Sequence, residues 1–188
     1  MRSMAVTKTP RRAWVDAGLE ALAEGGLAEV RIEVLARRLK VTKGGFYGFF
    51  DDRPALLAAM LETWEQTVTV SVTERVDAAA ATDPRARLAR LIAIIDDQSA
   101  PAMRIGTELA IRDWARHDEV AARTVRRVDR TRGDYLRDLF RGFCSAEEAD
   151  ARTTIAMSVR LGAQLMDLGT DHTSHLESLE LIQQRLLA

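Results

Sequence analysis

Apolar residues recur along this chain at steps of three and four, and no segment shows a convincing alternation of apolar and polar positions. This spacing is typical of amphipathic α-helices, so it predicts an all-α protein of about nine helices. The expected helices cover residues 11–24 and 32–39, a third from Thr42, a long fourth from Pro54 to about Ala81, a fifth opened by Asp83 and Pro84, a sixth from Pro101 to His117, a seventh capped by Asp118, and two more that start at Ser145 and Ser174.

The long fourth helix suggests how the chain is organised. Its stripe runs from Leu57 through Trp64 to Val72, far enough to leave a small N-terminal unit and enter the rest of the chain. We therefore expect two parts, an N-terminal domain of residues 1–53 and a larger helical domain of residues 54–188.

The eighth expected helix carries two apolar stripes, and the ninth carries one. A helix that is apolar over so much of its circumference needs partners on both sides. One interpretation is a homodimer whose interface is a four-helix bundle of these two helices from each subunit. The other is that both stripes are buried inside one subunit. The interface residues expected on the first interpretation are Ile155, Val159, Gly162, Met166, Leu179, Ile182 and Leu186.

Charge and composition add little to this picture. The net charge is −1, but residues 1–60 hold 10 Lys and Arg against 7 Asp and Glu. An excess of this size is a weak footprint for nucleic acid, because one solvated basic face would give the same count. The lone cysteine, Cys144, excludes an internal disulfide. With no apolar run long enough to span a membrane, we expect a cytoplasmic protein.

Residues 42–50, TKGGFYGFF, combine three glycines with four of the ten Phe, Trp and Tyr residues of the chain. In a helix, Phe46 and Phe50 share one face and can pack on Trp14, while Lys43 and Tyr47 share another face. Because the glycines beside that second face carry no side chains, a large partner can approach the backbone there. Together with the short helix before it, the segment predicts a helix-turn-helix whose second helix, capped by Thr42, enters the DNA major groove.

The run VLARRLKVTKGGFYGFFDDRPALLAAML, residues 34–61, resembles the DNA-binding signature of the TetR family of transcriptional regulators. The matching positions are Leu35-Ala36, Val41-Thr42, Gly44-Gly45, Phe46-Tyr47, Phe50, Arg53 and Leu56-Leu57. The resemblance implies an N-terminal helix-turn-helix domain, a connecting helix, and a C-terminal domain that binds an effector and dimerises.

Carried over by position, the resemblance implies DNA contacts from the helix-turn-helix segment. The expected DNA-binding residues are Arg31, Thr42, Lys43, Gly44, Gly45, Tyr47, Phe49 and Arg53. Three positions depart from the family pattern. Arg31 stands where Ser or Thr is frequent, and Gly48 and Phe49 stand where a large residue and a His are frequent. We therefore expect one or two phosphate contacts fewer, and more dependence on Lys43, on Arg53 and on a basic N-terminal arm of Lys8, Arg11 and Arg12.

The resemblance also implies a small-molecule effector in the larger domain, with Trp64, Met103, Trp114, Tyr135 and Met166 as candidate lining residues. Each of them is also an ordinary core residue type. No phosphate loop, nucleophile motif or paired catalytic carboxylates support an enzyme, and no cofactor is expected. His172 and His175 lack the further ligands of a metal site, so none is expected. The favoured hypothesis is a homodimeric repressor that binds a palindromic DNA operator, and the alternative is a helical ligand-binding or adaptor protein whose N-terminal unit contacts protein.

Overall fold

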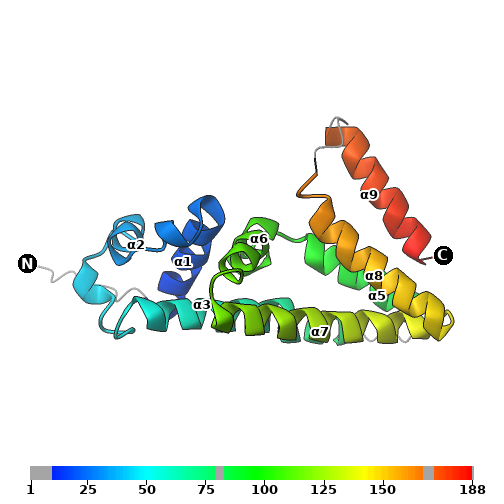
Figure 1. The fold of residues 1–188 in the computed structure, drawn as a ribbon, viewed down its shortest axis with the longest axis horizontal. Coiled ribbons are helices and arrows are strands. Elements are labelled where there is room, and N and C mark those ends of the chain that lie inside the picture. The colour runs from blue at the N-terminus through cyan, green and yellow to red at the C-terminus, as the bar shows by residue number, and fades with distance from the viewer. Residues whose placement is uncertain (1–9, 79–82, 167–171, 188) are drawn as a thin grey trace, which may run out of the picture. The chain divides into compact units, whose positions relative to one another are not determined.

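The computed structural model describes residues 10–78, 83–166 and 172–187, and every regular element in these ranges is helical. This confirms the predicted all-α class. The elements are α1 (Arg11–Gly25), η1 (Leu27–Glu29), α2 (Ile32–Arg38), η2 (Lys43–Gly45), α3 (Arg53–Val68), α4 (Val70–Asp77), α5 (Pro84–Asp96), η3 (Pro101–Met103), α6 (Ile105–Trp114), α7 (Glu119–Arg141), α8 (Ala146–Gly162) and α9 (His172–Leu187), as Figure 1 shows.

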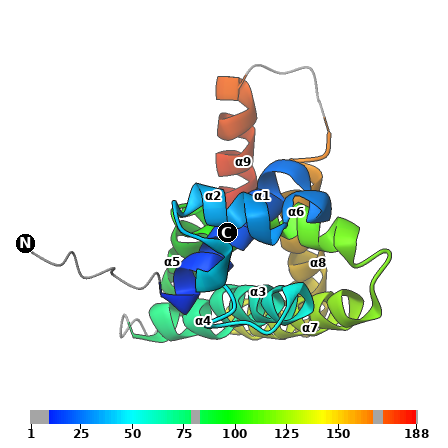
Figure 2. The ribbon, with the colours of Figure 1, turned by 90° about the vertical axis from the view of Figure 1, so that its left-hand side faces the viewer.

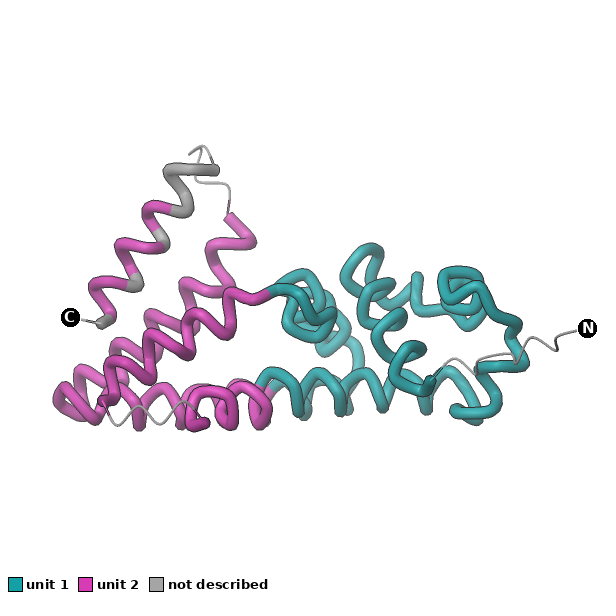
Figure 3. Tube along the Cα trace, turned by 180° about the vertical axis from the view of Figure 1, so that it is seen from behind, with its two compact units in different colours: residues 1–68, 98–125 teal, residues 69–97, 126–188 magenta. Residues whose placement is uncertain are grey.

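The chain divides into two compact units (Figure 3). Unit 1 comprises residues 1–68 and 98–125, and unit 2 comprises residues 69–97 and 126–188. By packing, α6 therefore belongs with the N-terminal helices, and the division falls inside α7. The expected functional domains of residues 1–53 and 54–188 stay a prediction, because they concern what each part binds.

In unit 1, α1 packs against α2, α3 and α6 (Figure 2). Its apolar face is fully buried, with Trp14, Leu19 and Leu22 at 0% exposure. Gly18 lets α1 approach α3 closely, because a Cβ atom at that position would lie 2.7 Å from the Sδ atom of Met60. This close packing fixes the support on which the helix-turn-helix segment rests.

The predicted long fourth helix is interrupted. Helix α3 ends at Val68 and α4 begins at Val70, and Thr69 between them has φ −121° and ψ −85°. The interruption falls in the run TVTVSVT, residues 67–73, whose β-branched residues are weak helix formers. In addition, the Thr67 hydroxyl donates to the Thr63 carbonyl at 2.6 Å, an interaction that tends to bend helices. The prediction of one continuous helix to about Ala81 was wrong for this local reason.

In unit 2, polar side chains join neighbouring helices. Arg87 of α5 donates to the carboxylate of Asp77 at the end of α4, and the Tyr135 hydroxyl of α7 donates to the same carboxylate at 3.1 Å. Burial, the largest cause, raises the pKa of Tyr135. Arg137 of α7 donates to Asp150 of α8 at 2.6 Å. These contacts hold α4, α7 and α8 to the rest of unit 2.

Candidate nucleic-acid interface

The helix-turn-helix segment consists of α2, a turn over residues 39–42, and η2 with the turns that follow it. Residues 42–50 do not form the regular α-helix that we predicted. The amides of Gly45 and Phe46 donate to the carbonyls of Thr42 and Lys43, three residues back, and Phe50 closes a single α-type turn on Phe46 at 3.1 Å. Three interior glycines explain this, because each costs an α-helix about 1 kcal/mol relative to alanine.

Thr42 precedes η2 with an extended backbone, at φ −83° and ψ 156°, but its side chain makes no capping hydrogen bond. The predicted hydroxyl cap was therefore wrong. Capping by this route needs amides oriented as in the first turn of an α-helix, and the segment starts instead with η2, a tighter 3₁₀ turn of three residues. The Thr42 side chain is exposed.

An aromatic cluster anchors the segment from inside. The Phe46 side chain is 0% exposed, and its ring centroid lies 5.4 Å from that of Trp14 and 5.3 Å from that of Phe50. Its edge-to-face and stacked contacts are the geometries in which aromatic pairs gain most. The predicted inward positions of Phe46, Phe50 and Trp14 are thus confirmed.

The opposite side of the segment is open. Lys43, Gly44, Tyr47 and Gly48 are exposed, and the Tyr47 side chain is 59% exposed although its ring rests edge-on against Phe46. A Cβ atom on Gly44 would meet a single neighbour within 4 Å, the Thr42 Oγ1 atom at 3.7 Å. This thin surface leaves the backbone accessible to a large partner.

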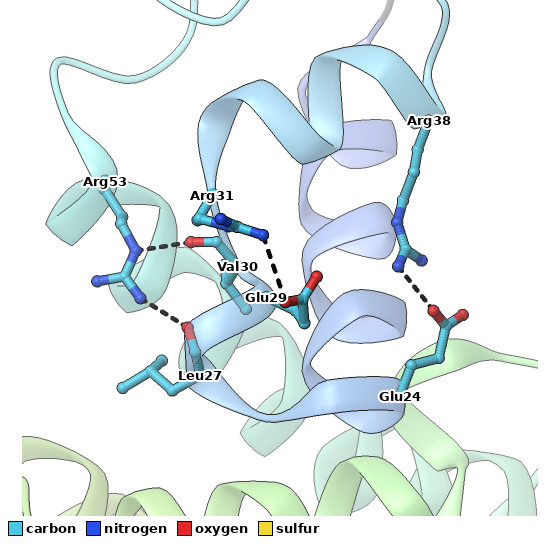
Figure 4. A network of polar contacts seen from close by, with 7 residues as sticks. All are labelled: Glu24, Leu27, Glu29, Val30, Arg31, Arg38 and Arg53. Carbon is cyan, nitrogen blue, oxygen red and sulfur yellow. Dashed lines mark hydrogen bonds and ion pairs between the residues drawn. The ribbon is translucent and has the colours of Figure 1, made fainter.

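Acidic residues accompany the cations of this surface. The Lys43 Nζ atom donates to the Glu33 carboxylate of α2 at 2.6 Å, and this hydrogen bond is the largest cause that lowers the pKa of Glu33. Arg31 donates to Glu29 at 3.3 Å, and Arg38 donates to Glu24 at 2.7 Å (Figure 4). The sequence count of a small positive excess did not reveal these pairs.

Arg53, at the start of α3, has two donors committed within the protein. Its Nε atom donates to the Val30 carbonyl at 2.6 Å, and its Nη2 atom donates to the Leu27 carbonyl at 2.8 Å (Figure 4). Arg53 therefore ties α3 to the backbone between α1 and α2. The DNA contact expected of Arg53 stays a prediction, beside this structural role that the sequence did not indicate.

Two further cations were missed by the sequence analysis. Arg37 and Lys40 are both exposed at the end of α2 and in the turn after it, and neither has an ion-pair partner in the described part of the chain. Basic residues directly before the predicted turn were the available signal. They extend the cationic surface of the helix-turn-helix segment.

The turn stores local strain at Lys40, whose φ is +56°. This left-handed conformation costs most L-residues about 1–2 kcal/mol, whereas glycine adopts it freely. Lys40→Gly is expected to raise the free energy of unfolding by about 0.5–1 kcal/mol, less than the full strain because glycine also adds freedom to the unfolded chain. Urea unfolding would measure it. Lys40→Ala is the matched control and should bring no such gain, and equal gains in both variants would contradict the strain.

The candidate effector residues fall in both units. Trp64, Met103 and Trp114 are buried in unit 1. Tyr135 and Met166 belong to unit 2, where the Tyr135 hydroxyl bonds to Asp77 and Met166 is 57% exposed. A lining role for these residues stays a prediction.

The expected dimer residues differ in exposure. Ile155 is 48% exposed and Met166 57%, while Val159, Gly162, Ile182 and Leu186 are half-buried. The Leu179 side chain lies outside the described residues. Leu165 and Leu181, at 70% and 50% exposure, were missing from the expected set.

No helix in the described ranges is both long and apolar enough to cross a membrane. Among the same described residues, no cluster of three or more His, Cys, Asp or Glu side chains is placed to hold a metal ion. The side chains of His172 and His175 lie outside the described residues.

Comparisons with known proteins address the N-terminal segment first. A family model described as "Bacterial regulatory proteins, tetR family" matches residues 15–60. The chain is also similar to the HTH-type transcriptional regulator BetI of Burkholderia ambifaria, with 28% identity over 124 residues. That match covers 65% of this chain and spans 63% of the length of the relative.

Solved structures share the fold over nearly the whole chain. A transcriptional regulator from Rhodococcus sp. Rha1 matches with a TM-score of 0.72 at 19% identity, covering 95% of this chain and 94% of the other. A TetR-family transcriptional regulator from Streptomyces coelicolor matches with 0.69 at 16% identity, covering 95% and 90%. A transcriptional regulator from Saccharomonospora viridis in complex with choline matches with 0.68 at 18% identity, covering 94% and 92%.

The helical fold and the α2-turn-η2 segment define a protein of the helix-turn-helix class. Within that class, the family model of the tetR regulators matches this very segment, and the chain is similar to the BetI regulator and shares the fold of solved transcriptional regulators.

Proposed function

We propose that this protein is a DNA-binding transcriptional regulator that acts as a repressor on a near-palindromic operator. The observation that carries the proposal is the two-sided segment of residues 42–50. Buried Phe46 anchors it, while exposed Lys43 and Tyr47 flank a glycine surface that a DNA groove can approach. Phosphate contacts from such side chains position a protein on the duplex. As a regulator of transcription it would act in the cytoplasm.

Exposed apolar side chains on α8, on the turn that follows it and on α9 support a homodimer. Ile155, Leu165, Met166 and Leu181 are all at least 48% exposed in the single chain. Exposed large apolar side chains favour a protein partner, and a second copy with twofold symmetry is the commonest one. Two subunits would present two helix-turn-helix segments to successive grooves of a palindrome.

A small-molecule effector completes the proposal. One solved neighbour of the same fold is a regulator in complex with choline, which supports a small molecule as the class of effector. Binding of the effector would shift the dimer between conformations in which the distance between the two helix-turn-helix segments fits the operator and conformations in which it does not. The adaptor alternative is not favoured, because the similarity to known proteins centres on the DNA-binding segment.

The double variant Lys43→Ala with Tyr47→Phe is expected to weaken operator binding by about 1–3 kcal/mol, because it removes one cation and one hydroxyl from the exposed face. Fluorescence anisotropy against a duplex from the DNA upstream of its gene, beside a scrambled duplex and at two salt concentrations, measures the loss. Arg123→Ala, which removes an exposed cation from α7, is the control and should leave affinity unchanged. Light scattering on the protein and its complex should give two subunits.

Unchanged operator affinity in the double variant would refute the assigned face. Equal, salt-insensitive binding of both duplexes by the wild-type protein would refute operator recognition itself, because DNA binding must weaken steeply with salt as condensed counterions are released.

A further inference from the structure

Lys43, the cation of η2 expected to contact a DNA phosphate, is already paired with Glu33 of α2. The Lys43 Nζ atom lies 2.6 Å from the Glu33 Oε1 atom, and both side chains are more than half exposed, at 56% and 59%. The two residues are ten positions apart, one on α2 and one on η2, so the pair forms across the helix-turn-helix itself. A cation expected to meet DNA is therefore already matched with a carboxylate.

The pair has two consequences for DNA. An exposed ion pair is only weakly stabilising, so Lys43 can exchange Glu33 for a phosphate oxygen. The exchange leaves the Glu33 carboxylate beside the phosphate backbone, however, where like charges repel. Binding through Lys43 is therefore offset by the loss of its internal partner and by the repulsion that this partner then exerts.

Neighbouring residues repeat the same arrangement. Arg31 pairs with Glu29 and Arg38 pairs with Glu24 (Figure 4). Glu33 differs from these because its partner belongs to η2, in the segment with the exposed glycine surface. Among the three acidic residues, Glu33 is thus the one that pairs with a cation of residues 42–50.

We propose that Glu33 attenuates DNA affinity by competing with the phosphate backbone for Lys43. This inference rests on the proposed DNA-binding function and adds a residue that sets its strength. Because phosphates are common to all sequences, the attenuation applies to operator and non-operator DNA alike. It would keep the free regulator from residing on non-specific DNA, where binding depends almost wholly on phosphate contacts.

The test compares wild type, Glu33→Gln, Lys43→Ala and the double variant in the full-length protein, by anisotropy on the upstream duplex and on the scrambled duplex. Glu33→Gln is expected to tighten binding about two- to fivefold on both duplexes. It should also steepen the log–log dependence of affinity on salt, by up to about 0.9 for one further neutralised phosphate. In the Lys43→Ala background most of the gain should vanish, since coupled residues give non-additive effects.

Glu62→Gln is the matched control. It removes the same charge from an exposed position on α3, outside the helix-turn-helix, and should not tighten binding. Circular dichroism of each variant confirms that α2 is intact.

The outcomes distinguish failure of the competition alone from failure of the proposed DNA-binding function. Wild-type binding with no gain in Glu33→Gln overturns the competition and leaves the regulator standing. A gain that persists fully in the Lys43→Ala background, or that Glu62→Gln reproduces, also overturns it, because general charge then explains the effect. If Glu33→Gln binds DNA and the wild-type protein does not, the competition is supported, and Glu33 then prevents binding altogether. Failure of both proteins on both duplexes overturns the competition together with the proposed function.

Discussion

Phe46→Ala is expected to lower the free energy of unfolding by about 3–5 kcal/mol, the range for truncating a buried aromatic residue. The Phe46 ring is 0% exposed and contacts the rings of Trp14, Tyr47 and Phe50. Its loss leaves a cavity that the glycine-rich segment above cannot fill, because Gly44, Gly45 and Gly48 carry no side chains. DNA binding should fall with it, since this ring holds the segment in place.

Urea unfolding followed by tryptophan fluorescence is the measurement. All three tryptophans, Trp14, Trp64 and Trp114, belong to unit 1, so the signal reports on the unit that contains Phe46. Tyr47→Ala is the matched control, because its side chain is 59% exposed and should cost less than about 1 kcal/mol. A loss of similar size in both variants would show that burial of Phe46 is not what anchors the segment.

Periodicity predicted the helical class and the inward side of the aromatic segment because both depend on the spacing of apolar residues. Phe46 and Phe50 are four apart, and a single turn is enough to place both on one side, whether or not a regular helix follows. The sequence could not tell a helix from a set of turns over residues 42–50. Three glycines destabilise an α-helix by a free energy comparable to the one that burial of the aromatic side chains contributes. Tertiary packing therefore decides which backbone conformation residues 42–50 adopt.

The polar contacts of the helix-turn-helix segment could not be predicted from the sequence for another reason. Glu33 and Lys43 are separated by ten residues, and Arg53 reaches back to Leu27 across twenty-six. No helical spacing links such positions, and their meeting depends on how the turns direct the chain. Among the predicted DNA-contact residues, Lys43 and Arg53 are the ones for which this matters, because each is engaged by partners ten or more residues away, whereas Arg31 pairs with Glu29 only two residues away.

Arg53→Ala is expected to destabilise unit 1 by about 2–4 kcal/mol, because hydrogen bonds from a charged donor contribute about 1.5–3 kcal/mol each. The Arg53 side chain is half-buried and donates to the carbonyls of Val30 and Leu27. Its removal leaves both acceptors without this donor at the point where η1 leads into α2. Tryptophan fluorescence during urea unfolding measures the loss, and anisotropy at low urea measures any separate effect on DNA.

Arg53→Lys separates the two roles of this residue. Lysine keeps the charge that a phosphate would attract, but its single ammonium group lacks the planar fork that reaches two carbonyls at once. If the main role of Arg53 is to stabilise the fold through its bonds to Val30 and Leu27, Arg53→Lys should lose most of the stability that Arg53→Ala loses. Full stability in both variants, with DNA affinity lost in Arg53→Ala alone, would instead make Arg53 a DNA contact whose bonds to Val30 and Leu27 contribute little. If Arg53 both stabilises the fold and contacts DNA, Arg53→Ala should lower the free energy of unfolding and the DNA affinity together. Part of the lost affinity would then come from a less rigid helix-turn-helix backbone.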